Sequence, residues 1–283
     1  MNQVQTLLNK YRRLTIVEKL ITLNCIVFVL TFAINTLVYL TGTSGNIIID
    51  GFALSSDTSE FIFKPWSLLS YGFMHAGFFH LLTNMIILYY MGNLFVEYFT
   101  PKRLLNFYWY GTAFGGILFL LSYAFFPTLK NSNSILVGAS AAVMAIFIGI
   151  TTYMPNYELR FRFIGYVKLW KLAAIFIALD IIQIPSSNAG GHIAHLGGAL
   201  FGFFQIYFEG NKTISIQNPF TNLFKKRPVM KTVYKNHETK KESSSVNNQK
   251  IIDAILDKIS KSGYDSLSKK EKDILFRQGK NNL

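Results

Sequence analysis

Six stretches of mostly hydrophobic residues run along the chain, and polar or basic segments separate them. The stretches are 19–40, 78–98, 104–126, 134–153, 169–184 and 191–208. About 20 apolar residues in a helix cross the hydrocarbon core of a bilayer, which is about 30 Å thick. The pattern therefore predicts a core of six transmembrane helices within 19–210, preceded by a short N-terminal segment, 1–18.

After the sixth stretch the pattern changes. Residues 211–249 are basic and poor in apolar side chains, a composition typical of flexible linkers. In 250–283, apolar residues recur at helical spacing from Ile251 to Ile259, and Ser268 and Glu271 form a capping-box pattern before a second apolar run. We predict a linker followed by a small two-helix unit, which would bind a partner or a second copy of the chain.

The composition agrees with a membrane protein. Of the 283 residues, 51% are hydrophobic and only 15% are charged, and the mean hydropathy is +0.29. Soluble domains of this length rarely reach that balance, so the predicted fold class is an all-α, polytopic membrane bundle. The net charge is +13, but Lys and Arg gather at the chain ends and in short connections. We therefore expect no binding to nucleic acid, which needs a basic patch on a folded domain.

The distribution of Lys and Arg predicts the orientation in the membrane. Basic residues lie before the first stretch, between the second and third, between the fourth and fifth, and after the sixth. The alternate connections contain one basic residue or none. By the positive-inside rule, both ends of the chain are cytoplasmic. Because six spans with short loops suit a bacterial inner membrane, we expect an integral multi-pass protein of that membrane.

The first external connection, 41–77, is much longer than the others. It contains several aromatic residues, among them Phe61, Phe63 and Trp66, and aromatic side chains are favoured at the membrane interface. We expect this segment to rest in the interface as a structured element. A loop without fixed structure is the alternative.

Polar side chains in three of the spans lie at a similar depth below the external surface. Ser140 lies about six residues into the fourth span, about 9 Å at 1.5 Å per residue. His195 lies near the external end of the sixth span, and His80 and Asn84 lie one turn apart near that end of the second. Polar groups cost free energy inside a membrane and are candidates for function. We predict that these side chains meet in one layer.

This set of residue types suits acyl transfer. An imidazole that accepts the proton of a serine hydroxyl makes that hydroxyl a good nucleophile, as His195 would for Ser140. The attacked carbonyl oxygen becomes negative and needs fixed hydrogen-bond donors. We expect these donors to be the side chains of His80 and Asn84 and the backbone N–H of Ser140.

Small residues predict a close approach of the fourth and sixth spans. Gly198 and Gly202 lie on the same face as the sixth-span histidine, and Ala141 and Ala145 form a small stripe on the fourth span. Such faces let helix backbones approach closely in lipid. Gly138 would leave room beside the serine.

The residues resemble the rhomboid intramembrane serine proteases. The resemblance rests on GASA around Ser140, AHLGG around His195, the HxxxN pair His80 and Asn84, and PWSLLSYGFMH before that pair. It covers 61–208 and neither end of the chain. One departure is Ala141, where many members have Gly, and its methyl group could narrow the pocket.

The resemblance implies a mechanism and its partners. Ser140 would be the nucleophile and His195 the general base and acid, with no metal and no cofactor. His80, Asn84 and the Ser140 amide would form the oxyanion hole. The substrates would be transmembrane segments of proteins in the lipid bilayer, and the fifth span would move as a gate for them.

Three further polar residues leave alternatives open. Asp180 lies at about the depth of Ser140 and would complete a Ser-His-Asp triad. Because the family works with a dyad and an acid near a helix end can reach the interface, we predict that Asp180 has no such role. We expect His75 to be an interfacial loop residue rather than a donor at the cavity mouth. We expect His192 to lie at the water boundary, with substrate contact as the alternative.

The predicted function is that of an intramembrane serine endopeptidase. The alternative within the same fold is a catalytically inactive rhomboid-like protein that binds transmembrane clients. Such a protein is expected to lack the serine or the histidine, and this chain has Ser140 and His195. A transporter is expected to have internal repeats or broken helices at the midplane, which the sequence pattern does not show.

Overall fold

A computed structural model describes residues 3–42, 45–130, 132–162, 164–186, 188–210 and 242–280. The chain divides into two compact units, Met1–Pro219 and Phe220–Leu283. The first unit contains the predicted membrane core and the second contains the predicted two-helix unit. Each unit is described by itself.

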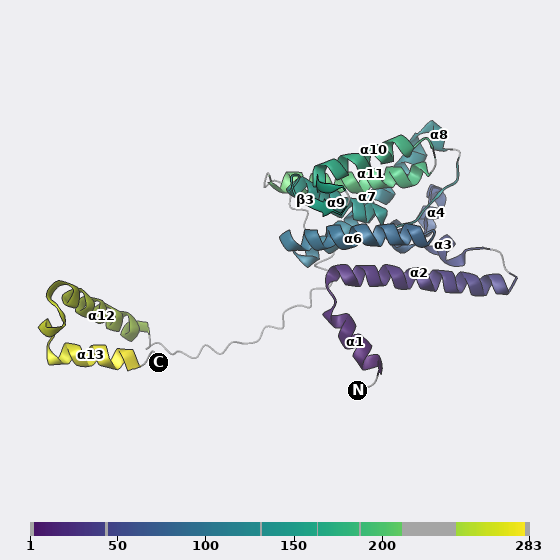
Figure 1. Ribbon diagram of the computed structural model, residues 1–283. Helices are drawn as coiled ribbons and strands as arrows, with labels where there is room; N and C mark the ends of the chain where they lie inside the picture. Colours follow the sequence, from purple (N-terminus) through teal and green to yellow (C-terminus); the bar gives the residue numbers. More distant parts are fainter. Residues whose placement is uncertain are drawn as a thin grey trace. The chain divides into compact units, whose positions relative to one another are not determined.

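The described part of the first unit contains a long helix near each predicted span (Figure 1). These helices are α2 (Ile16–Leu40), α6 (Phe78–Tyr98), α7 (Pro101–Phe125), α9 (Ser140–Tyr153), α10 (Leu169–Gln183) and α11 (Ala189–Gly210). Three of them, α2, α6 and α7, are long and apolar enough to cross a membrane, and α9 is a shorter apolar helix. The prediction of a helical membrane protein is therefore confirmed, with three helices meeting the criteria for a span.

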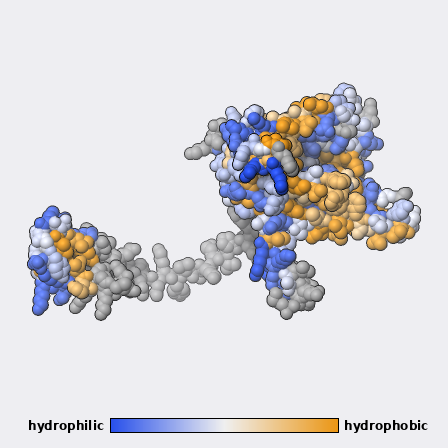
Figure 2. Space-filling model, in the orientation of Figure 1, coloured by the Kyte–Doolittle hydropathy of each residue, from blue (hydrophilic) through white to orange (hydrophobic). Residues whose placement is uncertain are grey.

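The surface of α2 shows why this unit belongs in lipid. Apolar side chains along it are half exposed or more, including Ile26, Val29, Leu30 and Leu37. Only four residues of α2 are buried. Figure 2 shows broad hydrophobic areas on the visible face of the helical unit. Exposed apolar surface of this extent marks contact with a membrane or a partner.

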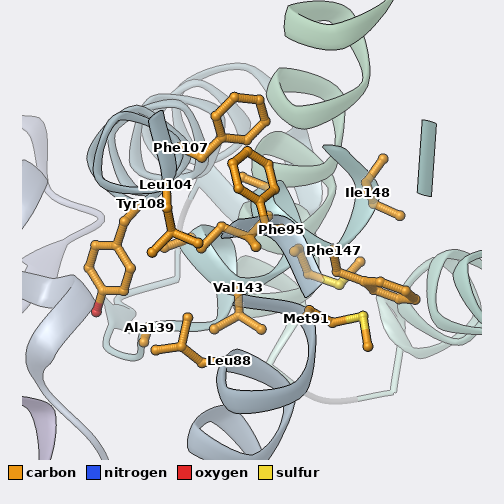
Figure 3. Close-up of a cluster of buried hydrophobic side chains, with 14 of the residues drawn as sticks. Leu88, Met91, Phe95, Leu104, Phe107, Tyr108, Ala139, Val143, Phe147 and Ile148 are labelled. Carbon is orange, nitrogen blue, oxygen red and sulfur yellow. The ribbon is translucent and has the colours of Figure 1, made fainter. Parts of the chain in front are cut away.

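Helix α9 lies at the centre of the first unit. It contacts α6, α7, α10 and α11, and every residue in 141–151 is buried. Its large apolar side chains, such as Val143 and Phe147, belong to the cluster in Figure 3, where Phe95 of α6 and Phe107 of α7 have ring centroids 4.8 Å apart. A helix that is apolar all round is typical of such a buried position.

The start of α9 differs from the prediction for the fourth span. The hydrophobic run begins at 134, but β2 (Ile135–Leu136) pairs antiparallel with β1 (Leu54–Ser55), and the helix begins at Ser140. Gly138 has a φ of +127°, a conformation that favours glycine and cannot continue a helix. Hydrophobicity alone did not reveal this turn. The result is that Ser140 lies in the first turn of a buried helix.

The long connection after α2 is structured, so the alternative of a loop without fixed structure is wrong. Its elements are α3 (Ile47–Phe52), β1, α4 (Thr58–Phe63), α5 (Ser67–Ser70) and the 3₁₀ helix η1 (Tyr71–Phe73). The Trp66 indole N–H donates to Gly51 O at 2.9 Å, and the Tyr71 hydroxyl donates to Thr112 O of α7 at 2.7 Å. Phe63 is 79% exposed. The placement of the whole connection, 41–77, in the membrane interface stays a prediction.

Other elements of the first unit were not predicted. They are α1 (Gln3–Arg13), α8 (Pro127–Lys130), and a hairpin of β3 (Glu158–Phe161) and β4 (Gly165–Lys168) between α9 and α10. Helix α2 begins with a capping box in which Thr15 and Glu18 exchange side-chain and backbone hydrogen bonds. This cap separates α2 from α1.

The second unit consists of α12 (Glu242–Ser262), the 3₁₀ helix η3 (Tyr264–Ser266) and α13 (Lys269–Lys280). The predicted cap is present, with the Ser268 backbone N–H donating to Glu271 Oε2 at 2.7 Å. Helix α12 begins at Glu242 and not at 250, so the predicted end of the linker is wrong. Residues 242–249 are mostly polar and show no apolar repeat that would predict a helix. The acidic Glu242 is nevertheless favourable at a helix N-terminus. The rest of the predicted linker, 211–241, lies outside the described residues.

Candidate active site

Ser140 is the first residue of α9. The N–H groups of a first helical turn have no partner four residues back within the helix, and the helix dipole makes this end positive. The preceding turn is held by the Gly138 N–H, which donates to Tyr71 O at 3.0 Å. The hydroxyl of Ser140 and its backbone N–H therefore lie together at a helix end that favours negative charge.

His195 of α11 lies next to this serine. The distance from its Nε2 to Ser140 Oγ is 2.7 Å, within hydrogen-bond range. The two helices are in backbone contact below the pair, because a Cβ added at Gly198 would collide with Ala141 O and one added at Gly202 would collide with Ala145 O. Close packing of small residues thus brings the hydroxyl and the imidazole together.

His80 lies on the other side of Gly138. A Cβ added at Gly138 would lie 2.7 Å from Cε1 and Nε2 of His80 and 3.5 Å from Ser140 Oγ. The absence of a side chain at Gly138 therefore lets the His80 ring approach the serine. Asn84 is buried one turn further along α6, and its Nδ2 donates to His80 O at 2.8 Å. The described contacts bring His80 near the serine but do not join Asn84 to it.

Asp180 lies against two histidines of α11, the arrangement that the prediction from the sequence did not favour. Its Oδ1 lies 2.8 Å from Nδ1 of His195 and 2.8 Å from Nδ1 of His192. The carboxylate is buried, and the side chain of His192 beside it is 13% exposed; its place relative to the water boundary stays a prediction. Since a carboxylate accepts from an N–H, this geometry suits a neutral His195 ring with its proton on Nδ1, which leaves Nε2 to accept from Ser140.

Sequence depth alone did not reveal this cluster. Depth says how far a residue lies into a span but not which neighbouring helix it faces. The signal that could have found it is the spacing of His192 and His195, three residues apart on one face of α11 and at about the depth of Asp180.

The same three residues are also metal-ligating types, with ligand atoms within 4.8 Å of one another. Oδ1 of Asp180 already accepts from both rings. A metal would therefore have to replace two hydrogen bonds that satisfy the cluster as it stands.

His75 lies in the loop between η1 and α6, where its side chain is buried. It is 1% exposed, and its ring centroid lies 5.2 Å from that of His80. Burial, and to a lesser degree the neighbouring His80, lower the pKa of His75 from 6.5 to about 4. His75 is therefore neutral near pH 7 and packs beside His80 as a buried side chain.

Ala141 does not narrow the space beside the serine. A Cβ added at Gly115 of α7 would lie 2.5 Å from Ala141 Cβ, so the Ala141 methyl group faces α7. The departure from the more common glycine is therefore accommodated by a glycine on the neighbouring helix.

Comparison with known proteins identifies the family. The rhomboid domain matches residues 63–212, more than half of the chain. A family of unknown function, DUF6576, matches residues 237–281. The chain belongs to the rhomboid family.

Several curated proteins are similar to this chain. RHOMBOID-like protein 12, mitochondrial, of Arabidopsis thaliana is 30% identical over 144 residues, 47% of this chain and 43% of that protein. Rhomboid-related protein 1 of Caenorhabditis elegans is 34% identical over 159 residues, 51% of this chain and 41% of that protein. Presenilin-associated rhomboid-like protein A, mitochondrial, of Danio rerio is 28% identical over 137 residues, 47% and 35% of the two chains.

The chain therefore spans less than half the length of these relatives. Two of the names state that the relatives are mitochondrial, which does not fit the predicted bacterial inner membrane. The broader prediction of an integral membrane protein is supported by the family and by the apolar helices.

Proposed function

We propose that the protein is an intramembrane serine endopeptidase that hydrolyses peptide bonds in or next to transmembrane segments. Ser140 is the nucleophile and His195 the general base and acid. The observation that carries this proposal is the 2.7 Å distance from Ser140 Oγ to His195 Nε2, inside a unit whose helices are apolar on their outer surfaces.

The dyad acts in two halves. Oγ of Ser140 attacks the carbonyl carbon of the substrate while its proton passes to Nε2 of His195. The imidazolium then gives that proton to the leaving amine, and the carbonyl group stays bound to Ser140 as an ester. Water attacks the ester while His195 again accepts a proton. The bond between the carbonyl carbon and Ser140 Oγ then breaks, His195 returns the proton to Oγ, and the second product leaves as a carboxylic acid.

The oxyanion of each tetrahedral intermediate needs donors near Ser140. The backbone N–H at the start of α9 is one, aided by the positive end of the helix dipole. The His80 ring, across Gly138, is the second. Asn84 is the third candidate: its amide has two N–H donors, of which His80 O accepts one.

The length of α9 supports a site below the membrane surface. Its 14 residues make a helix of about 21 Å, about 9 Å shorter than a hydrocarbon core of about 30 Å. With its far end at the cytoplasmic interface, its first residue lies inside the apolar layer. In this proposal all six long helices span the membrane, both termini are cytoplasmic, and Ser140 is near the external face. The proposal also includes binding of a partner or a second copy of the chain by the α12–α13 unit.

The test uses the purified full chain in liposomes with single-pass reporter proteins, and mass spectrometry identifies the fragments. Ser140→Ala should lower the cleavage rate by at least about 10³-fold. Ser186→Ala, an exposed serine between α10 and α11, is the matched control and should stay within about twofold. Cleavage that survives Ser140→Ala would overturn the mechanism. Reporters that bind the unmutated chain without being cut would favour the inactive client-binding protein.

A further inference from the structure

Helix α10 is held to the bundle by few buried side chains. Only Leu169, Ala173 and Asp180 are buried among its residues, and the first two lie in its first half. Around Asp180, the neighbouring Leu179 and Ile181 are about half exposed. An ionisable group on a helix with an apolar outer surface is costly unless it is paired. Asp180 is paired twice, and both partners are on α11.

We propose that Asp180 is a positioning residue for His195, through the contact between its Oδ1 and Nδ1 of that histidine. The proposal rests on the proposed function and replaces the prediction that Asp180 has no role beside the dyad. Asp180 does not touch the substrate and does not receive a proton during the reaction.

The contact does two things that a general base needs. The 2.8 Å hydrogen bond from Nδ1–H to Asp180 keeps Nε2 unprotonated and turns the ring edge toward Ser140, 2.7 Å away. When Nε2 takes the proton of Ser140, the ring becomes a cation beside a carboxylate, which stabilises it. Asp180 stabilises the imidazolium that accompanies each tetrahedral intermediate and does not touch the substrate, so its effect is expected in kcat.

His192 contacts the same oxygen of the carboxylate. Its Nδ1 also lies 2.8 Å from Asp180 Oδ1, and its ring meets that of His195 edge-on with centroids 5.8 Å apart. Because Asp180 comes from α10, whereas Ser140 and His195 come from α9 and α11, the orientation of the base depends on α10 staying packed against α11.

A purely structural role for Asp180 makes a different prediction. If the carboxylate only ties α10 to α11, then removal of His192, which breaks one of the two ties, should resemble removal of Asp180. If it positions His195, then the two changes should differ strongly. The matched pair is therefore Asp180→Asn and His192→Ala, each made in the full chain.

The rate experiment measures cleavage of a transmembrane reporter in liposomes. Asp180→Asn should lower kcat about 10²-fold or more with KM within about twofold, since loss of the corresponding acid costs up to about 10⁴-fold in serine proteases. His192→Ala should lose less than about tenfold. A wild-type kcat in Asp180→Asn, or an equal loss in His192→Ala, would overturn the proposal.

A second readout reports on the imidazole directly. In ¹⁵N spectra of histidine-labelled chain, the neutral His195 ring should show the Nδ1–H form in the wild type and a mixture of forms in Asp180→Asn. Asp180→Glu keeps a carboxylate, so it should retain the Nδ1–H form and exceed Asp180→Asn in kcat. An unchanged ring in Asp180→Asn, or a folded Asp180→Glu without the Nδ1–H form, would contradict the positioning role.

The two proposals fail in different ways. A wild-type chain that cuts no reporter contradicts the proposed function, while the ring spectra still test the contact with Asp180. Wild-type cleavage that Asp180→Asn leaves unchanged contradicts the positioning role alone.

Discussion

Gly115 lies on α7 where that helix meets both helices of the proposed dyad. A Cβ added there would lie 2.5 Å from Ala141 Cβ of α9 and 2.8 Å from Ala194 O of α11. Ala141 directly follows the proposed nucleophile, and Ala194 directly precedes the proposed base. The Gly115→Ala substitution should therefore displace α9, α11 or both.

The size of the effect follows from these distances. Carbon atoms in contact prefer about 3.5–4.0 Å, so the new methyl group is at least about 1 Å too close to Ala141. A shift of about 1 Å would lengthen the 2.7 Å distance from Ser140 Oγ to His195 Nε2 beyond the range of a hydrogen bond. Misplacement of this size can cost about 10²-fold in rate. Overpacking also destabilises a fold by about 1–3 kcal/mol.

The assay compares initial rates of reporter cleavage and thermal unfolding for Gly115→Ala and the wild type. Gly51→Ala is the matched control, because a Cβ at Gly51 in α3 meets no atom within 4 Å. We expect kcat/KM to fall about 10²-fold in Gly115→Ala and to stay within about twofold in Gly51→Ala. A wild-type rate and melting temperature for Gly115→Ala would refute the reasoning, since the dyad would then not depend on this packing.

Two further predictions concern the turn before the serine and the second unit. Gly138→Ala should lower activity at least tenfold, because its φ is +127° and its Cβ would lie 2.7 Å from the His80 ring. Gly45→Ala is the control, because Gly45 also has a positive φ, +138°, but a Cβ added there meets no atom within 4 Å. An equal loss of activity in Gly45→Ala would contradict the role of the contact between Gly138 and His80. The Ser268 backbone N–H and hydroxyl lower the pKa of Glu271 from 4.5 to about 2. Since the pKa is lower in the folded state, the stability from this cap is present above about pH 4.5 and is lost as the pH falls toward 2. NMR shifts of α13 in the full chain should lose helical character over that interval, and unchanged shifts at pH 2 would contradict it.

The positions of the long helices could be predicted because each is set by a local property, a run of apolar residues of sufficient length. The boundaries of α6 at Phe78 and Tyr98 agree with the prediction for this reason. The start of α9 could not be predicted in the same way. It depends on the backbone conformation of Gly138 and on a strand pair with residues far away in the sequence, and neither changes the hydropathy.

The same difference between local properties and contacts of distant residues applies to the candidate site. The spacing of small residues and the depth of the polar ones were enough to predict that Ser140 and His195 meet. The partner of His195 on its other side depends on how α10 is rotated about its own axis, and hydropathy along α10, whose polar residues are Lys171, Asp180 and Gln183, does not fix that rotation. The contact with Asp180 therefore had to come from the three-dimensional structure.

The central claim is that Ser140 is a nucleophile activated by His195. Its most direct test is covalent labelling of the purified full chain with a fluorophosphonate, followed by mass spectrometry of its peptides. We predict an adduct on Ser140 in the wild type and a rate of labelling at least about 10³-fold lower in His195→Ala. An adduct on a different residue, no adduct on the wild type, or equal labelling of His195→Ala would contradict the claim.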